Sequence, residues 1–167
     1  MTSSVEHRFM QQQGFLDADG PACAAHFRAL RFQPSIVGPL ILLGIILQSR
    51  FVFAALSALL WFGVALPRWN VFEALYNALV AEPMKRQKLT PAPAPRRFAQ
   101  GMAATFMLVV AVALSMGWYW TGVVFEAFIV IAFLALLFGK FCLGSYIYHL
   151  IRGRSELANA TLPWSKS

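Results

Sequence analysis

Four residues near the end of the last apolar segment carry side chains that could do chemistry: Cys142, Ser145, Tyr146 and His149. On one continuous helix their spacing places all four on a narrow stripe, because a helical turn takes about 3.6 residues. Cys142 and His149 would still lie roughly 10 Å apart along the axis, too far for a nucleophilic pair. Ser145 and His149 are one turn apart, but they lack the third group and the oxyanion hole that a serine nucleophile needs. The pattern favours a packed helix end, with Cys142 as a candidate thiol and no complete catalytic site.

The other cysteine, Cys23, lies three residues before His26, and the two could supply metal ligands. Two ligands are too few for a structural zinc site, and the remaining histidines are distant in the sequence. Cys23 and Cys142 also lack the close spacing of redox, zinc or haem-attachment motifs. We therefore predict no metal site and no cofactor.

The amino-acid composition is that of an integral membrane protein. Hydrophobic residues make up 59% of the 167-residue chain and charged residues only 13%, which leaves too little polar surface for a compact soluble domain. The length suits a single membrane domain covering residues 1–167. The first residues lack a basic start, an apolar core and a small-residue cleavage site, so we expect no removable signal peptide.

Four apolar segments predict the fold. Residues 101–119 and 122–139 are long enough to cross a bilayer, which takes about 20 mostly apolar helical residues. Residues 36–47 and 51–66 are shorter, and we interpret them as a tight hairpin that flanking residues lengthen. A re-entrant hairpin, which enters and leaves on the same face, is the alternative. The prediction is an all-α integral membrane protein with four transmembrane helices in two hairpins.

The basic residues orient this bundle, because short loops rich in lysine and arginine stay in the cytoplasm. Only Arg50 falls in a turn on the opposite side. We therefore predict a multi-pass protein of the bacterial inner (cytoplasmic) membrane with both termini in the cytoplasm. Its parts are a cytoplasmic N-terminal segment (1–31), a first hairpin (32–66), a surface helix with a basic proline-rich loop (67–100), a second hairpin (101–151) and a cytoplasmic tail (152–167).

The stretch that follows the first hairpin is predicted to form a helix along the inner membrane surface. Apolar residues recur there at helical spacing: Val71, Phe72, Leu75, Tyr76, Leu79 and Val80. The polar residues Asn70, Glu73 and Asn77 would face away from this apolar side, as in an amphipathic surface helix, which Pro83 ends. The alternating prolines of residues 90–95 then favour an extended strap.

The same loop carries five residues that are candidate contacts to lipid or to a partner: Lys85, Arg86, Lys88, Arg96 and Arg97. Cations beside a bilayer attract anionic lipid head groups, each by about 1 kcal/mol. These cations could instead dock the acidic face of a partner protein. Nothing in their arrangement resembles a motif that reads nucleic acid, so no nucleic-acid partner is predicted.

Glu126 is the only charged residue within 122–139, and a carboxylate at that depth is costly without a partner. The predicted topology puts Arg50 at the same outer interface. We therefore expect Arg50 and Glu126 to form an ion pair across the bundle. The alternative is that Glu126 reaches the head-group region on its own.

Two stretches, PAPRRFAQGMAATF and FLALLFGKFCLGSYIYHL, resemble the second half of a bacterial membrane-protein family catalogued as a domain of unknown function. That family shows Pro-Lys-Arg-Phe-Ala-Gln-Gly at the start of one helix and Phe-Cys-Leu-Gly-Cys near the end of the next. The resemblance covers roughly residues 95–148 and implies a small multi-span inner-membrane protein. The paired cysteines of typical members imply a thiol-redox or sulfur-handling role.

The chain departs from the family pattern at residue 145. Cys142 matches the first cysteine, but Ser145 stands in place of the second, so no internal disulfide can form there. We therefore predict a non-enzymatic accessory or structural subunit of a larger inner-membrane complex, for which a photosynthetic or respiratory assembly is a natural host. Its partners would be anionic lipids and other membrane-protein subunits. The alternative is a thiol-redox or sulfur-handling protein using Cys142; a small transporter, for which paired intramembrane charges are lacking, ranks third.

Overall fold

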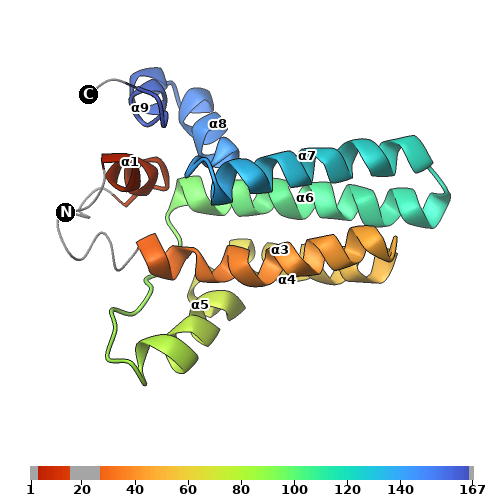
Figure 1. Ribbon diagram of the computed structural model, residues 1–167, viewed down its shortest axis with the longest axis horizontal. Coiled ribbons are helices and arrows are strands. Elements are labelled where there is room, and N and C mark those ends of the chain that lie inside the picture. Colours follow the sequence, from red (N-terminus) through yellow and green to blue (C-terminus); the bar gives the residue numbers. More distant parts are fainter. Residues whose placement is uncertain (1–3, 16–26, 166–167) are drawn as a thin grey trace.

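The computed structural model describes residues 4–15 and 27–165. In this part of the chain every regular element is a helix, and the long helices form two antiparallel hairpins (Figure 1). The first hairpin consists of α3 (Phe32–Ile46) and α4 (Arg50–Ala65), and the second of α6 (Ala94–Met116) and α7 (Tyr119–Leu137). The predicted all-helical class is confirmed.

Short helices gather at one end of the hairpins (Figure 1). They are α1 (Ser4–Gln12), a 3₁₀ turn (Pro67–Trp69), α5 (Val71–Tyr76) with a π-helical continuation (Asn77–Ala81), α8 (Leu143–Ile151) and α9 (Ser155–Ala160). We call this end, with α1, α5, α8 and α9, the basic end, because the basic loop between the hairpins lies there. Arg8 of α1 joins the two ends of the described chain, since its guanidinium donates to the carbonyl oxygens of Pro163 and Ser165.

Three helical segments of the described chain are long and apolar enough to span a membrane: Phe27–Ile46, Ala94–Met116 and Tyr119–Leu137. By length and composition, the expected number of four spanning helices in the described residues is therefore corrected to three. α4 is apolar but has 16 residues, about 24 Å of helix against a hydrocarbon core of about 30 Å. It is short because the Ser49 side chain caps its start, accepting from the backbone N–H of Val52, and Pro67 follows its end.

α6 is the central helix, and α4, α7 and α8 all pack against it. Buried side chains of α4 and α6 meet along this contact: Phe53, Leu56, Leu60, Ala104, Met107 and Val110. One polar bond joins the two helices, since the Ser57 hydroxyl donates to the carbonyl oxygen of Ala104 at 2.8 Å. Because three other helices pack against α6, the positions of the residues at its start are fixed.

The sequence predicts one helix that runs through Cys142, Ser145, Tyr146 and His149, but the last spanning helix ends before them. α7 ends at Leu137, and Lys140 in the turn that follows has a left-handed backbone (φ 47°). A Cβ atom on Gly139 would lie 2.7 Å from the carbonyl oxygen of Ala135, so this turn requires glycine. Cys142 consequently lies just before the first turn of a separate helix, α8.

The expected surface helix forms, but the side turned toward the protein carries its polar residues together with Phe72 and Tyr76. Asn70 and Glu73 are buried, whereas Leu79 is 61% exposed. The Asn77 side chain forms hydrogen bonds of 2.7 and 3.1 Å with the backbone of Leu89, just before the strap. The expected orientation is therefore corrected. Lipid can cover apolar side chains, whereas polar groups beside a bilayer need protein partners.

The contact between α6 and α8 predicts a destabilising substitution. A Cβ atom on Gly144 would lie 2.6 Å from the Cα atom of Ala99, where backbone would have to move. We expect Gly144→Ala to lower stability by about 1–3 kcal/mol, the usual cost of overpacking, measured as a lower melting temperature in detergent. Gly122→Ala is the matched control, because its Cβ would meet no atom closer than 3.9 Å. Equal melting temperatures for the two variants would contradict the close contact.

Candidate functional site

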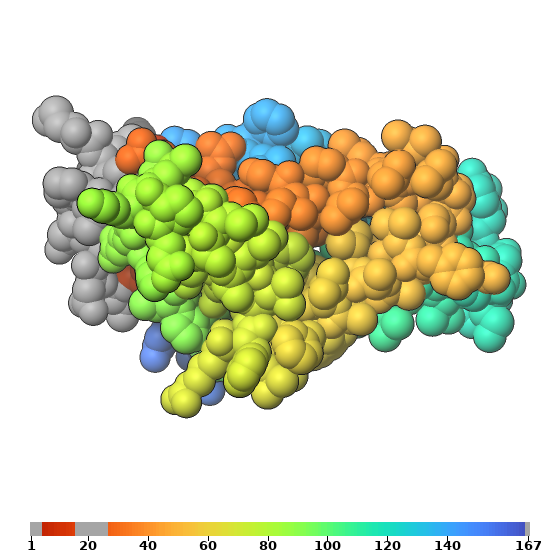
Figure 2. Space-filling view, turned by 90° about the horizontal axis from the view of Figure 1, so that it is seen from below, coloured from red at the N-terminus to blue at the C-terminus, as the bar shows by residue number. Residues whose placement is uncertain are grey.

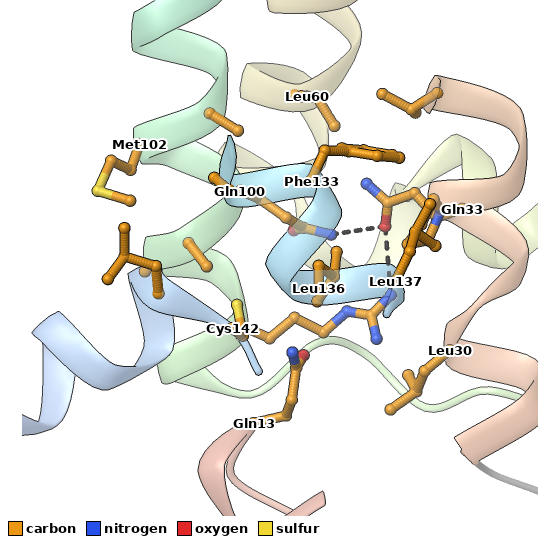
Figure 3. Close-up of a pocket in the computed structure, with 18 of the residues that line it drawn as sticks. Gln13, Leu30, Gln33, Leu60, Gln100, Met102, Phe133, Leu136, Leu137 and Cys142 are labelled. Carbon is orange, nitrogen blue, oxygen red and sulfur yellow. Dashed lines mark hydrogen bonds between the residues drawn. The ribbon is translucent and has the colours of Figure 1, made fainter. Parts of the chain in front are cut away.

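The two motifs of the family resemblance come together at the basic end. Arg96 and Gln100 lie in the first turns of α6, and Cys142 and Gly144 lie at the start of α8. All four line one pocket between these helices, α3 and α7, together with Gln33 of α3 (Figure 3). Residues that are far apart in the sequence, and that make the family recognisable, are therefore neighbours in space.

Gln33 lies at the centre of the polar contacts in this pocket. Its Oε1 atom accepts from Nε2 of Gln100 at 2.8 Å and from Nη2 of Arg96 at 3.2 Å (Figure 3). All three side chains are buried. The Oε1 atom of Gln100 is buried without a hydrogen-bond partner, an arrangement that costs free energy inside a protein. The network thus leaves one acceptor unsatisfied.

Cys142 is a buried free thiol in the wall of the pocket. Ser145 stands one turn further on, and its Oγ atom lies 3.4 Å from Sγ of Cys142. The same hydroxyl lies 3.3 Å from the carbonyl oxygen of Pro95, at the start of α6. The backbone N–H of Cys142 donates to Oε1 of Gln12 in α1 at 2.8 Å. In the place of a second thiol, the serine links α8 to α6.

His149 is buried on α8 like Ser145, but the two side chains are not hydrogen-bonded to each other. The Nε2 atom of His149 lies 3.0 Å from the backbone oxygen of Gln12, and its Nδ1 atom is buried without a partner. Tyr146 is half-buried, and its hydroxyl donates to Oδ1 of Asn159 in α9 at 3.2 Å. The expected polar stripe is therefore divided among contacts with α1, α6 and α9.

The pocket is mostly apolar and has a volume of about 140 Å³. Leu60, Met107 and Ile129 form its deeper walls, toward the middle of the bundle, and Phe133 of α7 lines it as well (Figure 3). The polar side chains of Arg96 and the glutamines are at the basic end. The site therefore combines an apolar interior with a polar, positively charged end.

Four of the five basic residues proposed as lipid or partner contacts lie outside this pocket. Lys85, Arg86 and Lys88 are exposed, and Lys88 pairs with Glu82 at 2.8 Å. Arg97 is partly buried and lines a second, more open groove. These four positions agree with contacts at a surface.

Arg96 is the exception, because it is 6% exposed. α6 begins at Ala94, and its first turn directs Arg96 toward Gln33 instead of toward solvent. Within the described part of the chain, Arg96 forms one hydrogen bond and no salt bridge. The structure thus assigns it to the pocket and not to the surface.

Glu126 has a different partner from the expected one. Its two carboxylate oxygens lie 3.2 and 3.4 Å from Nε2 of Gln48, in the turn between α3 and α4. The guanidinium of Arg50 lies 5.0 Å from the centre of the Phe51 ring. No salt bridge joins Arg50 and Glu126, both of which the structure describes. A neutral amide therefore takes the place of the expected cation.

Glu73 of α5 is a buried acid close to the pocket. Burial raises the pKa of Glu73 from its usual 4.5 to about 7, although the nearby charge of Arg96 lowers it. A large part of Glu73 is therefore protonated near neutral pH. The buried guanidinium of Arg96 consequently has only a weak counter-charge beside it.

The possible metal ligands Cys23 and His26 lie outside the described residues. Within residues 4–15 and 27–165, no three histidine, cysteine or acidic side chains are close enough to hold a metal ion. That the Cys23 pair binds no metal stays a prediction.

Gln33, Gln100 and Glu73 were not singled out from the sequence. One signal was present, because Gln100 follows Arg96 by four residues and so shares its helix face. No comparable signal marks Gln33, which lines the pocket from α3, or Glu73, which interacts with Arg96 from α5.

Helices of spanning length, joined in hairpins around a mostly apolar interior, define this chain as a helical membrane protein. The chain belongs to the family described as a domain of unknown function (DUF4395), whose model matches residues 27–153. The match confirms the resemblance drawn from the motifs and extends it to the first hairpin. No curated protein and no solved structure matches the chain.

The raised pKa of Glu73 makes the stability of the protein depend on pH. Between pH 4.5 and about 7 the unfolded chain ionises this carboxyl while the folded protein keeps it protonated, so stability falls as pH rises. Glu73→Gln removes the carboxyl and with it this loss of stability at higher pH. We expect the variant to be more stable than the wild type at about pH 8, by at most about 3 kcal/mol, and equally stable near about pH 4.

Melting temperatures in detergent across this pH range measure the effect. Glu82→Gln is the matched control, since Glu82 is exposed and paired with Lys88. If the difference in melting temperature between Glu73→Gln and the wild type does not increase from about pH 4 to about pH 8, the buried, protonated state of Glu73 is contradicted.

Proposed function

We propose that this protein is a non-enzymatic accessory subunit of a larger complex in the bacterial inner membrane. A groove of about 520 Å³ at the basic end, between the end of α4 and the strap, carries the proposal. Arg68, Trp69, Pro91 and Arg97 line it. Trp69 is 72% exposed, and the Nε atom of Arg97 is buried without a partner. Tryptophan and arginine are enriched among the residues that dominate binding at protein interfaces, which supports a docking role.

The space-filling view from the side of the first hairpin supports the same role (Figure 2). The elements from α4 to the strap form a continuous surface there, on which the surface helix stands out from the spanning helices. Leu79 and Val71 of that helix are exposed. A neighbouring subunit and membrane lipids would share this apolar surface.

The exposed side of α7 is a second surface for packing against membrane neighbours. In its most apolar stretch, 17% of the residues are buried within the chain, against 33% in each of the other two spanning helices. Phe128, Ile131 and Leu134 are exposed on it. In an accessory subunit, lipid and neighbouring helices together would cover these side chains.

We propose further that the basic end faces the cytoplasm. Lys85, Arg86 and Lys88 are exposed there, and short loops rich in such residues remain cytoplasmic. α4 would then return the chain across the membrane beside α6, with the 3₁₀ turn Pro67–Trp69 lengthening it at the interface. The proposal is four crossings with both termini in the cytoplasm, although three helices reach spanning length by themselves.

Single cysteines in a background without Cys23 and Cys142 test this topology. Arg50→Cys, at the first residue of α4, should react with a membrane-impermeant maleimide added outside spheroplasts. Gln87→Cys, in the basic loop, should react only after permeabilisation. Labelling of Gln87→Cys from outside would contradict the orientation, and an Arg50→Cys that stays unlabelled from outside would favour a re-entrant hairpin.

Purification of the tagged protein in gentle detergent, with mass spectrometry of what co-purifies, tests the accessory role. We expect a defined set of membrane subunits with the wild type. Arg68→Glu with Arg97→Glu should reduce at least one of them by about tenfold or more, because reversed charges repel an acidic partner surface. Arg152→Glu with Arg154→Glu, exposed elsewhere at the basic end, is the matched control. A chain that always purifies alone would contradict the proposal.

A thiol-redox or sulfur-handling role is the second candidate. The position of Cys142 in the wall of a pocket favours it, since the guanidinium of Arg96 is near enough to interact with its thiolate. With Ser145 in place of a second thiol, the chemistry would be limited to a mixed disulfide with another protein. If the thiol-redox role is correct, Cys142→Ala should abolish function. If the accessory role is correct, the same variant should keep the co-purifying subunits of the wild type.

A further inference from the structure

The pocket at the basic end reaches into the middle of the bundle. It extends along α6 from Arg96 to Met107, about 16 Å of helix at about 1.5 Å per residue. Val37 of α3 and Phe133 of α7 line the other sides. An engineered apolar cavity of about 150 Å³ binds benzene, so the volume of about 140 Å³ here holds the first several carbons of one apolar chain and not the two chains of a bilayer lipid. The rest of a longer chain would lie in the surrounding lipid or detergent.

Arg96 places a buried charge, which Glu73 neutralises only in part, at one end of this apolar space. A guanidinium has five N–H donors, and within the described chain that of Arg96 forms one hydrogen bond, to Gln33. Among the described residues it has no salt bridge, and Glu73, the acid that acts on it, has a pKa of about 7 and is therefore only about half ionised near pH 7. A buried cation in this state attracts an anion, because the surrounding medium screens charge weakly.

Gln100 adds an independent observation. Its side chain is 8% exposed, and its Oε1 atom is buried without a partner in the pocket wall. Its amide nitrogen is already engaged with Gln33. The polar end of the pocket therefore offers N–H donors from Arg96 and one free acceptor from Gln100, which suits a head group with both acidic oxygens and a hydroxyl.

We propose that this pocket binds a single-chain amphiphile with an acidic oxygen head group, a carboxylate or a phosphate monoester, and that Arg96 holds the head group. The acidic oxygens accept from the guanidinium, and the apolar chain extends between α3 and α7 toward Met107. A hydroxyl on the head group donates to Oε1 of Gln100. The head group lies beside Cys142 and covers its thiol.

Calorimetric titration of the purified full chain in a neutral maltoside detergent tests the proposal. The probes are hexadecanoate, hexadecyl phosphate and, as the neutral match, hexadecanol. We expect an acidic probe to bind one to one and hexadecanol to bind on the order of 30-fold more weakly or not at all, because it leaves the buried cation unpaired. Preference for hexadecanoate identifies a fatty-acid head group, and preference for hexadecyl phosphate identifies a phosphorylated one.

Variants assign the binding to this pocket. Arg96→Gln should weaken binding of the acidic probe by about 30-fold or more, and it should still fold, because it removes a buried charge that Glu73 neutralises only in part and so relieves a desolvation cost. Ala132→Phe should block the apolar part while Arg96 stays in place, since Ala132 lines the pocket from α7. Arg86→Gln, at an exposed position, is the matched control and should bind like the wild type.

Two results would overturn the proposal. One is equal affinity for hexadecanol and for both acidic probes, which would show that the charge of Arg96 plays no part. The other is unchanged binding of the acidic probes by Arg96→Gln, which would place them elsewhere on the protein.

Discussion

A positive charge held inside a bundle of apolar helices is the constraint on which the basic end of this molecule depends. Arg96 lies in the first turn of α6, the helix that α4, α7 and α8 all contact. Gln33 and Gln100 supply polar contacts around it, and Glu73 supplies a partial counter-charge. These groups would be costly against lipid, so α3, α5 and α6 turn their polar residues inward at this end.

The two family motifs can be explained by this arrangement. Arg96, at the lysine position of the first motif, and the motif's Gln100 form the polar end of the pocket, and Ala99 between them receives Gly144 of α8 at close range. In the second motif the cysteine lines the pocket, and Ser145 links α8 to the start of α6 through the carbonyl oxygen of Pro95. The turn at Gly139 makes this possible, because it separates α8 from α7 and lets it lie across α6. Residues of both motifs therefore form one site, the pocket and the contact between α6 and α8.

Hydropathy predicts the hairpins because the bilayer dictates how long an apolar segment must be. It does not predict where α7 stops, since that depends on one glycine, Gly139, with no room for a side chain. Periodicity does not predict which residues of the surface helix meet protein, since Asn70 and Glu73 are buried beside Phe72 and Tyr76, whereas the apolar Leu79 is exposed. Charge alone suggests a cation for Glu126, whereas the neighbour in space is the amide of Gln48. The four-residue spacing of Arg96 and Gln100 was the usable signal for the pocket.

The most direct test is to identify what the protein carries out of its own membrane. Native mass spectrometry weighs the intact chain together with any molecule that stays bound in gentle detergent. We predict one additional mass on the wild-type chain, equal to a single-chain carboxylic acid or phosphate monoester, and its absence from Arg96→Gln. A wild-type chain without any added mass, or the same added mass on both proteins, would contradict the role of Arg96 as the anchor of the pocket.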